Sequence, residues 1–271
     1  EEIMDAGDQL KVISNYAVGY DNIDVEAATE RGIVVTNTPG VLTESTAEMA
    51  WSLIFAVMRH VARGDKYVRR DKFEGWDPDL MIGHEIHKKT LGVVGMGNIG
   101  SCVARKAEAF DMDIIYYSRS RKKDIEEKIG AEYVDFETLL SNSDIITVHV
   151  PLTEETDSMI SWEELDLMRE DSYLINTSRG EIINEEALIE ALRSHKIAGA
   201  GIDVYADEPY GANPDYYDLD NVVLTPHLGS ATREARDGMS EMAADNLIAV
   251  LEGERPKHVV NPEVFEDRSL R

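Results

Sequence analysis

Short apolar runs alternate with amphipathic segments along the middle of this chain. Each run is long enough for one strand, and the segments between them carry apolar side chains at helical spacing. The pattern predicts strands at residues 91–94, 114–117, 133–134, 145–148, 173–176, 198–202 and 222–224, and helices at about 101–110, 124–129, 136–141, 161–168 and 185–194. Strands that alternate with helices build a parallel sheet covered on both faces, so we expect an α/β fold with a doubly wound, Rossmann-type sheet.

A second, smaller set of elements lies on either side of this region. We expect strands at residues 10–17 and 33–36, helices at 25–31 and 231–251, and one long helix over about 44–66. The apolar stripe of the long helix, which includes Met49, Leu53 and Val57, predicts either a core contact or a subunit interface. We expect residues 40–228 to form one domain. Residues 1–39 and 229–271 are too few to bury a core alone, so we interpret them as parts of a second domain whose beginning is missing.

A glycine-rich turn, Gly95-Met96-Gly97-Asn98-Ile99-Gly100, directly follows the apolar run at residues 91–94. A helix and another strand come after it, which is the order found in a dinucleotide-binding βαβ unit. Gly95 would allow the tight turn, Gly97 would let a pyrophosphate approach the backbone, and Gly100 would let the helix pack against its strand. The first N–H groups of the helix would then face the phosphates. We therefore predict that residues 40–228 bind a dinucleotide through this turn.

The loop after the second strand of this unit indicates which dinucleotide is bound. An NAD site normally has Asp or Glu about 20 residues after the glycine turn, to bind the ribose 2′-hydroxyl. This chain instead has Ser118-Arg119-Ser120-Arg121, followed by two lysines. An acid would repel a 2′-phosphate, whereas guanidinium groups and hydroxyls would hold it. We expect these four residues to bind NADPH in preference to NADH; the alternative is an ordinary solvated basic loop.

The composition excludes several classes of function. The 271 residues include 27 Lys and Arg against 53 Asp and Glu, which gives a formal charge of −26. Nucleic-acid binding depends on neutralising phosphates with Lys and Arg, so DNA and RNA are not expected partners. The longest apolar stretch, residues 49–58, is too short to cross a bilayer, and no export signal opens the chain, so we expect a cytoplasmic protein without a membrane partner. The single cysteine, Cys102, excludes an intrachain disulfide.

Three polar segments, residues 176–180, 203–209 and 225–230, follow the last three predicted strands. Open α/β sheets bind ligands beyond the carboxyl ends of their strands, so Arg179, Glu208 and His227 are expected to meet there. An Arg can hold a carboxylate substrate with two parallel hydrogen bonds. A His can exchange a proton near neutral pH, and an adjacent Glu would fix its tautomer. Each residue alone is more often an ion-pair partner or a turn residue, but the three together predict a catalytic site.

The chain resembles the D-isomer-specific 2-hydroxyacid dehydrogenases, and among them the glyoxylate and hydroxypyruvate reductases most. The resemblance rests on residues 15–24, 36–43, 95–100, 116–122, 176–180, 201–209 and 226–232, which run nearly from end to end. The family normally has a longer N-terminal half of its substrate domain, so this chain differs from the family at its N-terminus. The resemblance implies that residues 1–39 and 229–271 belong to a flavodoxin-like substrate domain, and that two copies form a homodimer through the helix at 44–66.

The resemblance also implies a role for each matching residue. Arg179 would bind the carboxylate and carbonyl of the substrate, His227 would be the general acid and base, and Glu208 would hold the imidazolium. The N–H groups of Val18 and Gly19 would bind the other side of the substrate carboxylate. The remaining expected residues are cofactor contacts: Asp203, which would orient the nicotinamide amide, and Thr46, Val150, Pro151, Thr177 and Ser230.

We therefore predict an enzyme that reduces a small 2-oxo acid, glyoxylate or hydroxypyruvate, with NADPH. The alternatives are a dehydrogenase of 3-phosphoglycerate or another D-2-hydroxy acid, a non-catalytic module that senses the nucleotide, and an inactive remnant that still binds it. No second cation cluster marks a phosphate-bearing substrate, and the presence of Arg179, Glu208 and His227 argues against a non-catalytic module.

Other residues that could carry chemistry have simpler interpretations. His84 and His87 are three residues apart, but no carboxylate or cysteine completes a ligand set, so we expect no metal site. Trp51, Trp76 and Trp162 are expected in a core or an interface.

The excess of acid predicts a dependence on salt. Carboxylates repel one another and destabilise the folded chain unless ions screen them, and the screening length falls to about 3 Å near 1 M salt. We hypothesise a salt-rich cytoplasm as the working environment. The melting temperature and the activity should both rise as potassium chloride is raised to molar concentrations. Full stability and full activity at low salt would contradict this hypothesis.

Overall fold

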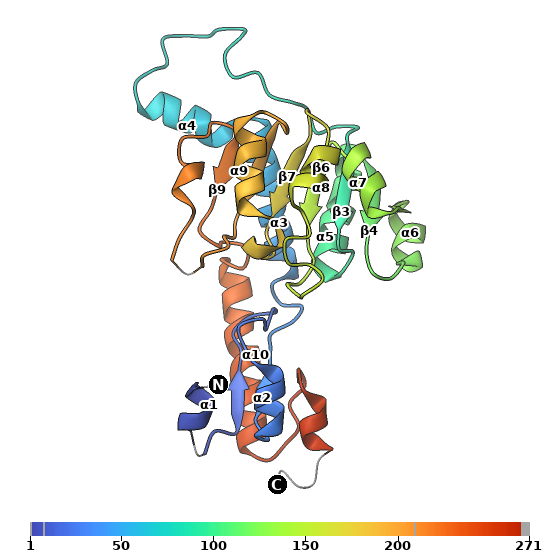
Figure 1. Ribbon diagram of the computed structural model, residues 1–271, viewed down its shortest axis with the longest axis vertical. Helices are drawn as coiled ribbons and strands as arrows, with labels where there is room; N and C mark the ends of the chain where they lie inside the picture. Colours follow the sequence, from blue (N-terminus) through green and yellow to red (C-terminus); the bar gives the residue numbers. More distant parts are fainter. Residues whose placement is uncertain (1, 8, 209, 267–271) are drawn as a thin grey trace. The chain divides into compact units, whose positions relative to one another are not determined.

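The computed structural model describes residues 2–7, 9–208 and 210–266, and the chain divides into two compact units (Figure 1). The larger unit is Glu44–Gly229, and the smaller unit combines Glu1–Thr43 with Ser230–Arg271. That the smaller unit is a substrate domain stays a prediction.

A parallel sheet of seven strands, counted over the described residues, forms the centre of the larger unit. Its strand order is β5-β4-β3-β6-β7-β8-β9. The strands are β3 (Thr90–Val94), β4 (Asp113–Tyr117), β5 (Glu132–Tyr133), β6 (Ile145–Val148), β7 (Tyr173–Asn176), β8 (Gly199–Ile202) and β9 (Val222–Leu224). The chain adds strands outward in one direction from β3 and then in the other from β6, so the predicted doubly wound α/β fold is confirmed.

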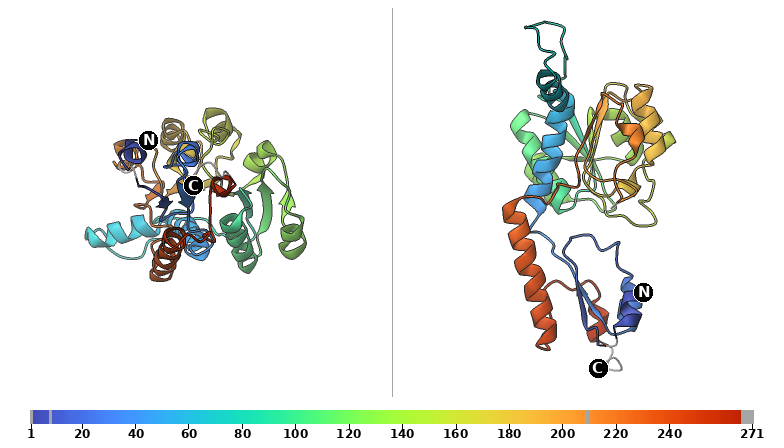
Figure 2. Two further views of the ribbon diagram at one scale, coloured as in Figure 1. Left: turned by 90° about the horizontal axis from the view of Figure 1, so that it is seen from below. Right: turned by 90° about the vertical axis from the view of Figure 1, so that its left-hand side faces the viewer.

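Helices cover both faces of the sheet (Figure 2). Neighbouring strand residues point to opposite faces, so Leu91 and Val93 pack in one core while Val94 packs in the other. The first face is covered by α3 (Thr43–Met58) and α5 (Asn98–Ala107), and the second by α7 (Phe136–Asn142), α8 (Trp162–Leu167) and α9 (Glu185–Arg193). The shorter elements of this unit are α6 (Lys123–Ile129), η1 (Glu108–Phe110), η2 (Gly180–Ile182) and η3 (Pro214–Tyr216).

Side-chain caps fix where several of these helices begin. The carboxylate of Asp135 accepts the N–H of Thr138 at the start of α7, and Asn184 caps α9 in the same way. Ser161 and Glu164 form a capping box before α8. The helix predicted from residue 161 therefore begins at Trp162, because Ser161 is its cap.

The prediction of one long helix over residues 44–66 is wrong. α3 ends at Met58, and a separate helix, α4 (Val61–Arg69), follows His60, whose φ of +52° lies in the left-handed region. The cause is a contact from later in the chain. The N–H of His84 donates to the carbonyl of Met58 at 3.0 Å, and a ring nitrogen of His60 contacts the carbonyl of Ile82 at 3.2 Å. The end of α3 is thus bonded to the returning loop instead of to a further helical turn.

The apolar stripe of α3 belongs to the core of its own unit. Leu53, Ile54 and Val57 are buried there, and the indole N–H of Trp51 donates to the carbonyl of Val103. Of the two predicted uses of the stripe, core and interface, the structure confirms the first, so an interface with a second copy would have to use other residues.

The smaller unit is built around a two-stranded parallel sheet of β1 (Val12–Ser14) and β2 (Val34–Thr36). Around it lie α1 (Glu2–Ala6), α2 (Val25–Glu30), α10 (Arg233–Leu251) and η4 (Pro262–Phe265). The buried side chain of Asn261 accepts the N–H of Val35 at 2.8 Å and donates to the carbonyl of Ile33 at 2.9 Å. This amide joins the segment after α10 to β2, a contact that the hydrophobic pattern does not reveal.

Candidate active site

The turn between β3 and α5 uses glycine where a side chain would not fit. Gly95 has a φ of +97°, and a Cβ on Gly100 would collide with the carbonyl oxygen of Gly95. Only glycine therefore lets α5 approach its strand this closely. At Gly97, by contrast, a Cβ would meet nothing within 4 Å. The packing of the protein does not require glycine at that position, and the space beside it is open to a ligand.

The beginning of α5 fits a phosphate group. Gly97 is the N-cap residue, and no side chain among the described residues caps the first N–H groups of the helix. Such a helix end carries unpaired N–H groups and a positive partial charge. Met96 is buried and Ile99 packs against the same core, so the turn presents backbone to its surroundings. These features suit the pyrophosphate of a dinucleotide.

In the basic loop after β4, the side chain of Arg121 is hydrogen-bonded to a neighbouring carboxylate, whereas, within the described residues, that of Arg119 is not. The guanidinium of Arg121 makes bonds of 2.8 and 3.1 Å to the carboxylate of Glu126, which also accepts the hydroxyl of Tyr116 at 2.7 Å. These two donors lower the pKa of Glu126 to about 2. Arg119 is exposed and, among the described residues, makes no hydrogen bond or ion pair. Ser118 is half-buried and Ser120 is exposed.

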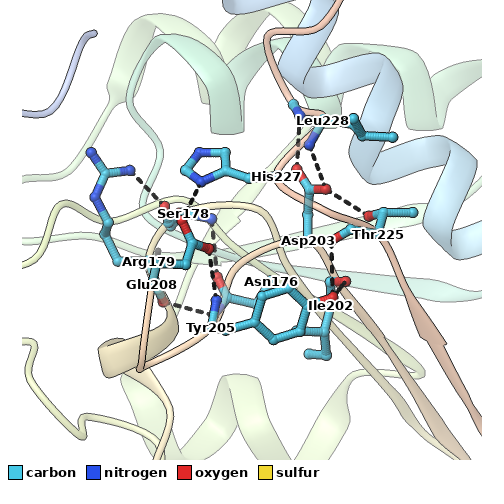
Figure 3. Close-up of polar contacts among 11 residues, drawn as sticks. Asn176, Ser178, Arg179, Ile202, Asp203, Tyr205, Glu208, Thr225, His227 and Leu228 are labelled. Carbon is cyan, nitrogen blue, oxygen red and sulfur yellow. Dashed lines mark hydrogen bonds and ion pairs between the residues drawn. The ribbon is translucent and has the colours of Figure 1, made fainter. Parts of the chain in front are cut away.

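Arg179 lies on a segment that Asn176 holds in place after β7 (Figure 3). The side-chain amide of Asn176 donates to the carbonyl of Arg179 at 2.8 Å and accepts the N–H of Ser178 at 3.0 Å. The hydroxyl of Ser178 donates to the carbonyl of Val148 at 2.8 Å, which ties the segment to the end of β6. The α-carbon of Gly180 packs against the backbone of Tyr205, so the segments after β7 and β8 lie side by side.

Glu208 and His227 form a bonded pair at the same edge of the sheet (Figure 3). Nδ1 of His227 donates to Oε2 of Glu208 at 2.6 Å, and the N–H of Tyr205 donates to Oε1 at 2.9 Å. A carboxylate only accepts hydrogen bonds, so the proton on Nδ1 is fixed and Nε2 is the nitrogen left to exchange a proton. Pro209, the last residue of this predicted segment, lies outside the described residues.

Asp203 is fully buried after β8, and the segment after β9 is bonded to it (Figure 3). Its Oδ1 accepts the hydroxyl of Thr225 at 2.6 Å and the N–H of Leu228 at 2.7 Å, and its Oδ2 accepts the N–H of Gly229 at 2.7 Å. Sequence reasoning missed these contacts, because they join residues more than twenty positions apart through loops without a repeating pattern.

The three polar segments predicted at the strand ends are thus adjacent in the structure, beside a turn that fits a dinucleotide. The model of the family described as "D-isomer specific 2-hydroxyacid dehydrogenase, NAD binding domain" matches residues 51–229. The chain belongs to this dehydrogenase family. It is also 54% identical to a glyoxylate reductase of Thermococcus litoralis over 269 residues, which cover 98% of this chain and 81% of that protein.

Two solved structures extend the comparison for this dehydrogenase. A glyoxylate reductase from Paecilomyes thermophila is 37% identical with a TM-score of 0.88, and the match covers 97% of this chain and 78% of that one. An NADPH-dependent glyoxylate/hydroxypyruvate reductase from Sinorhizobium meliloti, in complex with NADP and malonate, is 35% identical with a TM-score of 0.88, and the match covers 95% of this chain and 80% of that one.

The other predicted cofactor contacts of the dehydrogenase lie in both units. Val150 packs over Gly95, and Pro151 is exposed next to it. Thr46 is buried and packs against Gly229. The hydroxyl of Thr177 is buried at the end of β7 without a partner among the described residues, which suits a hydrogen bond to a ligand. Ser230 belongs to the smaller unit.

Val18 and Gly19 also belong to the smaller unit of the dehydrogenase. The amide of Asn37 donates to the carbonyl of Val18 at 2.8 Å, and the amide of Asn15 donates to the carbonyl of Gly19 at 2.7 Å. Their N–H groups have no hydrogen-bond partner in the part of the chain that the structure describes. Two neighbouring N–H groups of this kind suit an anion.

The histidines considered for a metal have protein partners instead. Nδ1 of His84 shares a hydrogen bond of 2.8 Å with the hydroxyl of Tyr173, and Nε2 of His87 lies 3.1 Å from the carboxylate of Asp111. Within the described residues, no three His, Cys, Asp or Glu side chains gather as a metal site would require. No helix among the same residues is both long and apolar enough to span a membrane.

Proposed function

We propose that this dehydrogenase reduces a small 2-oxo acid, glyoxylate or hydroxypyruvate, to the 2-hydroxy acid with a nicotinamide cofactor. The contact that carries the proposal is the 2.6 Å bond between Glu208 and Nδ1 of His227, next to the Arg179 segment, because it leaves Nε2 for the substrate. The names of the relatives, glyoxylate reductase and glyoxylate/hydroxypyruvate reductase, support the choice of substrate.

Each side chain has a separate role in the proposed reaction. A reduced nicotinamide cofactor, held through its pyrophosphate at the glycine turn, would supply a hydride to the carbonyl carbon. His227 delivers the proton on Nε2 to the carbonyl oxygen, and Glu208 stabilises the imidazolium that exists before this transfer. Arg179 holds the substrate carboxylate and faces the charge that develops on the oxygen. The N–H groups of Val18 and Gly19 bind the carboxylate as well.

A panel of 2-oxo acids, assayed through the absorbance of NADPH and NADH in high and low salt, tests the proposal. Glyoxylate and hydroxypyruvate should have the highest kcat/KM. Cofactor binding without turnover of any 2-oxo acid would contradict the proposal and favour a nucleotide-sensing module.

Arg179→Lys should lower kcat/KM for glyoxylate by roughly 100-fold, since removing one optimally placed donor to a developing oxyanion costs about this much. A lysine keeps the charge but cannot reproduce the two-pronged hydrogen bonding of a guanidinium. Steady-state kinetics on the variant measure the effect. Near-native turnover would show that Arg179 has another role.

We further propose that the cofactor is NADPH, held at its 2′-phosphate mainly by Arg119, with Ser118 and Ser120. The bonds between Arg121 and Glu126 favour Arg119 as the available guanidinium. Cells keep reduced nicotinamide cofactors inside, so the enzyme would work in the cytoplasm.

Arg119→Ala should raise the Kd for NADPH about tenfold, which is close to the loss of one charged hydrogen bond, and leave the Kd for NADH unchanged. Fluorescence titration with each cofactor measures both constants. Lys123→Ala is the control, because it removes the same charge from the first residue of α6, directly after this loop. Equal effects of the two variants on NADPH would mean that only the overall charge matters.

We also propose a homodimer that uses α4 and the loop after it. In Figure 1 and Figure 2 this segment extends beyond the sheet. It exposes Val68, Phe73, Trp76 and Ile82, with Trp76 85% exposed, and patches of this kind mark interaction sites. Residues 59–72 also carry six Lys and Arg but two Asp, in a chain of charge −26. A basic helix packed against the acidic surface of a second copy would offset the repulsion between copies, as an isologous interface allows.

The double variant Trp76→Asp, Ile82→Asp should convert the dimer to a monomer of 30.3 kDa. Light scattering after gel filtration in high salt measures the mass. Trp162→Asp is the matched control, because Trp162 is 52% exposed on α8, away from this segment, and its variant should remain dimeric. A monomeric parent protein, or a double variant that stays dimeric, would refute the proposed interface.

A further inference from the structure

His227 has a backbone conformation that residues other than glycine rarely adopt. Its φ is +53°, in the left-handed region. The residues around it are bonded to Asp203: the hydroxyl of Thr225 and the N–H of Leu228 donate to its carboxylate, and the N–H of His227 donates to its carbonyl at 2.9 Å. A strained residue persists only where its surroundings over-determine it, and here one buried aspartate does so.

The same contacts determine where the imidazole lies. The φ of His227 sets the direction in which its side chain leaves the backbone, and the 2.6 Å bond to Glu208 requires that direction. Tyr205 links the two parts, because its hydroxyl donates to the carbonyl of Thr225 at 2.9 Å while its N–H donates to Glu208. The hydrogen bonds around Asp203 and the bond that orients the imidazole therefore belong to one connected network (Figure 3).

We propose that Asp203 and Thr225 are positioning residues for His227: they hold the segment 225–229 so that Nε2 is aimed at the substrate. The inference rests on the proposed function of His227 as the proton donor. It assigns Asp203 a role through this segment, beside any contact with the cofactor. The side chain of Asp203 is 0% exposed, and both of its oxygens accept hydrogen bonds from the segment after β9.

Thr225 offers the most specific test, because its hydroxyl donates to Asp203 and its replacement leaves the carboxylates of Asp203 and Glu208 in place. Thr225→Val keeps the shape of the side chain but removes the donor, and Thr225→Ser restores the donor. Thr138→Val is the matched control, since the Thr138 hydroxyl also donates to an aspartate, Asp135, at 2.9 Å on the exposed start of α7.

In Thr225→Val, kcat with hydroxypyruvate should fall at least about tenfold, since a misplacement of about 1 Å costs about 100-fold in rate. The Kd for NADPH should stay within about twofold, and the primary isotope effect with 4-deuterated NADPH should rise. Thr225→Ser should regain most of the loss, and Thr138→Val should behave like the parent. A proton NMR spectrum of the ligand-free protein should also show the downfield signal of the His227 Nδ1 proton displaced in Thr225→Val.

An unchanged kcat and an unmoved Nδ1 signal in Thr225→Val would overturn the inference. So would a loss confined to the Kd for NADPH, which would mean that Asp203 acts directly on the cofactor. If Thr225→Val does not fold, Tyr205→Phe removes the other side-chain bond to this residue and should lower kcat in the same way. An inactive parent protein would instead refute the proposed function, and the NMR comparison would still test the positioning.

Discussion

A buried carboxylate, that of Asp203, joins the ends of two neighbouring strands. It follows β8 directly, and its three hydrogen-bond donors come from the segment after β9. A buried carboxylate is tolerated only where such donors surround it, so the fold at this edge and the burial of Asp203 depend on each other. The paired Glu208 and His227 are built on this connection, and so is the unusual backbone of His227.

The sheet explains why polar chemistry gathers at this edge. β6, β7 and β8 are buried on both faces, so the larger unit can place charged groups only at the strand ends and on its outer helices. The glycine turn after β3 and the segments after β7, β8 and β9 all follow the carboxyl ends of parallel strands. A cofactor and a small acid could therefore meet there without any opening in the core.

Much of this was predictable from the sequence. The strands at residues 145–148, 173–176 and 222–224 agree with the structure, because short apolar runs stand out from their polar surroundings. The break after Met58 was not predictable, since no glycine or proline marks it and its cause is a contact with residues 82–84. The pairing of Arg121 with Glu126 and the donors around Asp203 depend in the same way on three-dimensional neighbours. The order of strands and polar segments predicted that Arg179, Glu208 and His227 follow strands at one edge of the sheet, but it could not give the distance between any two of them.

The central claim is that a fixed imidazole and a fixed guanidinium hold a 2-oxo acid so that a reduced nicotinamide would deliver its hydride to one face of the carbonyl. The most direct measurement is the chirality of the glycerate formed when the parent protein, in high salt, reduces hydroxypyruvate with NADPH. A D-isomer-specific site predicts D-glycerate alone. L-glycerate, a racemic mixture or no glycerate would contradict the account.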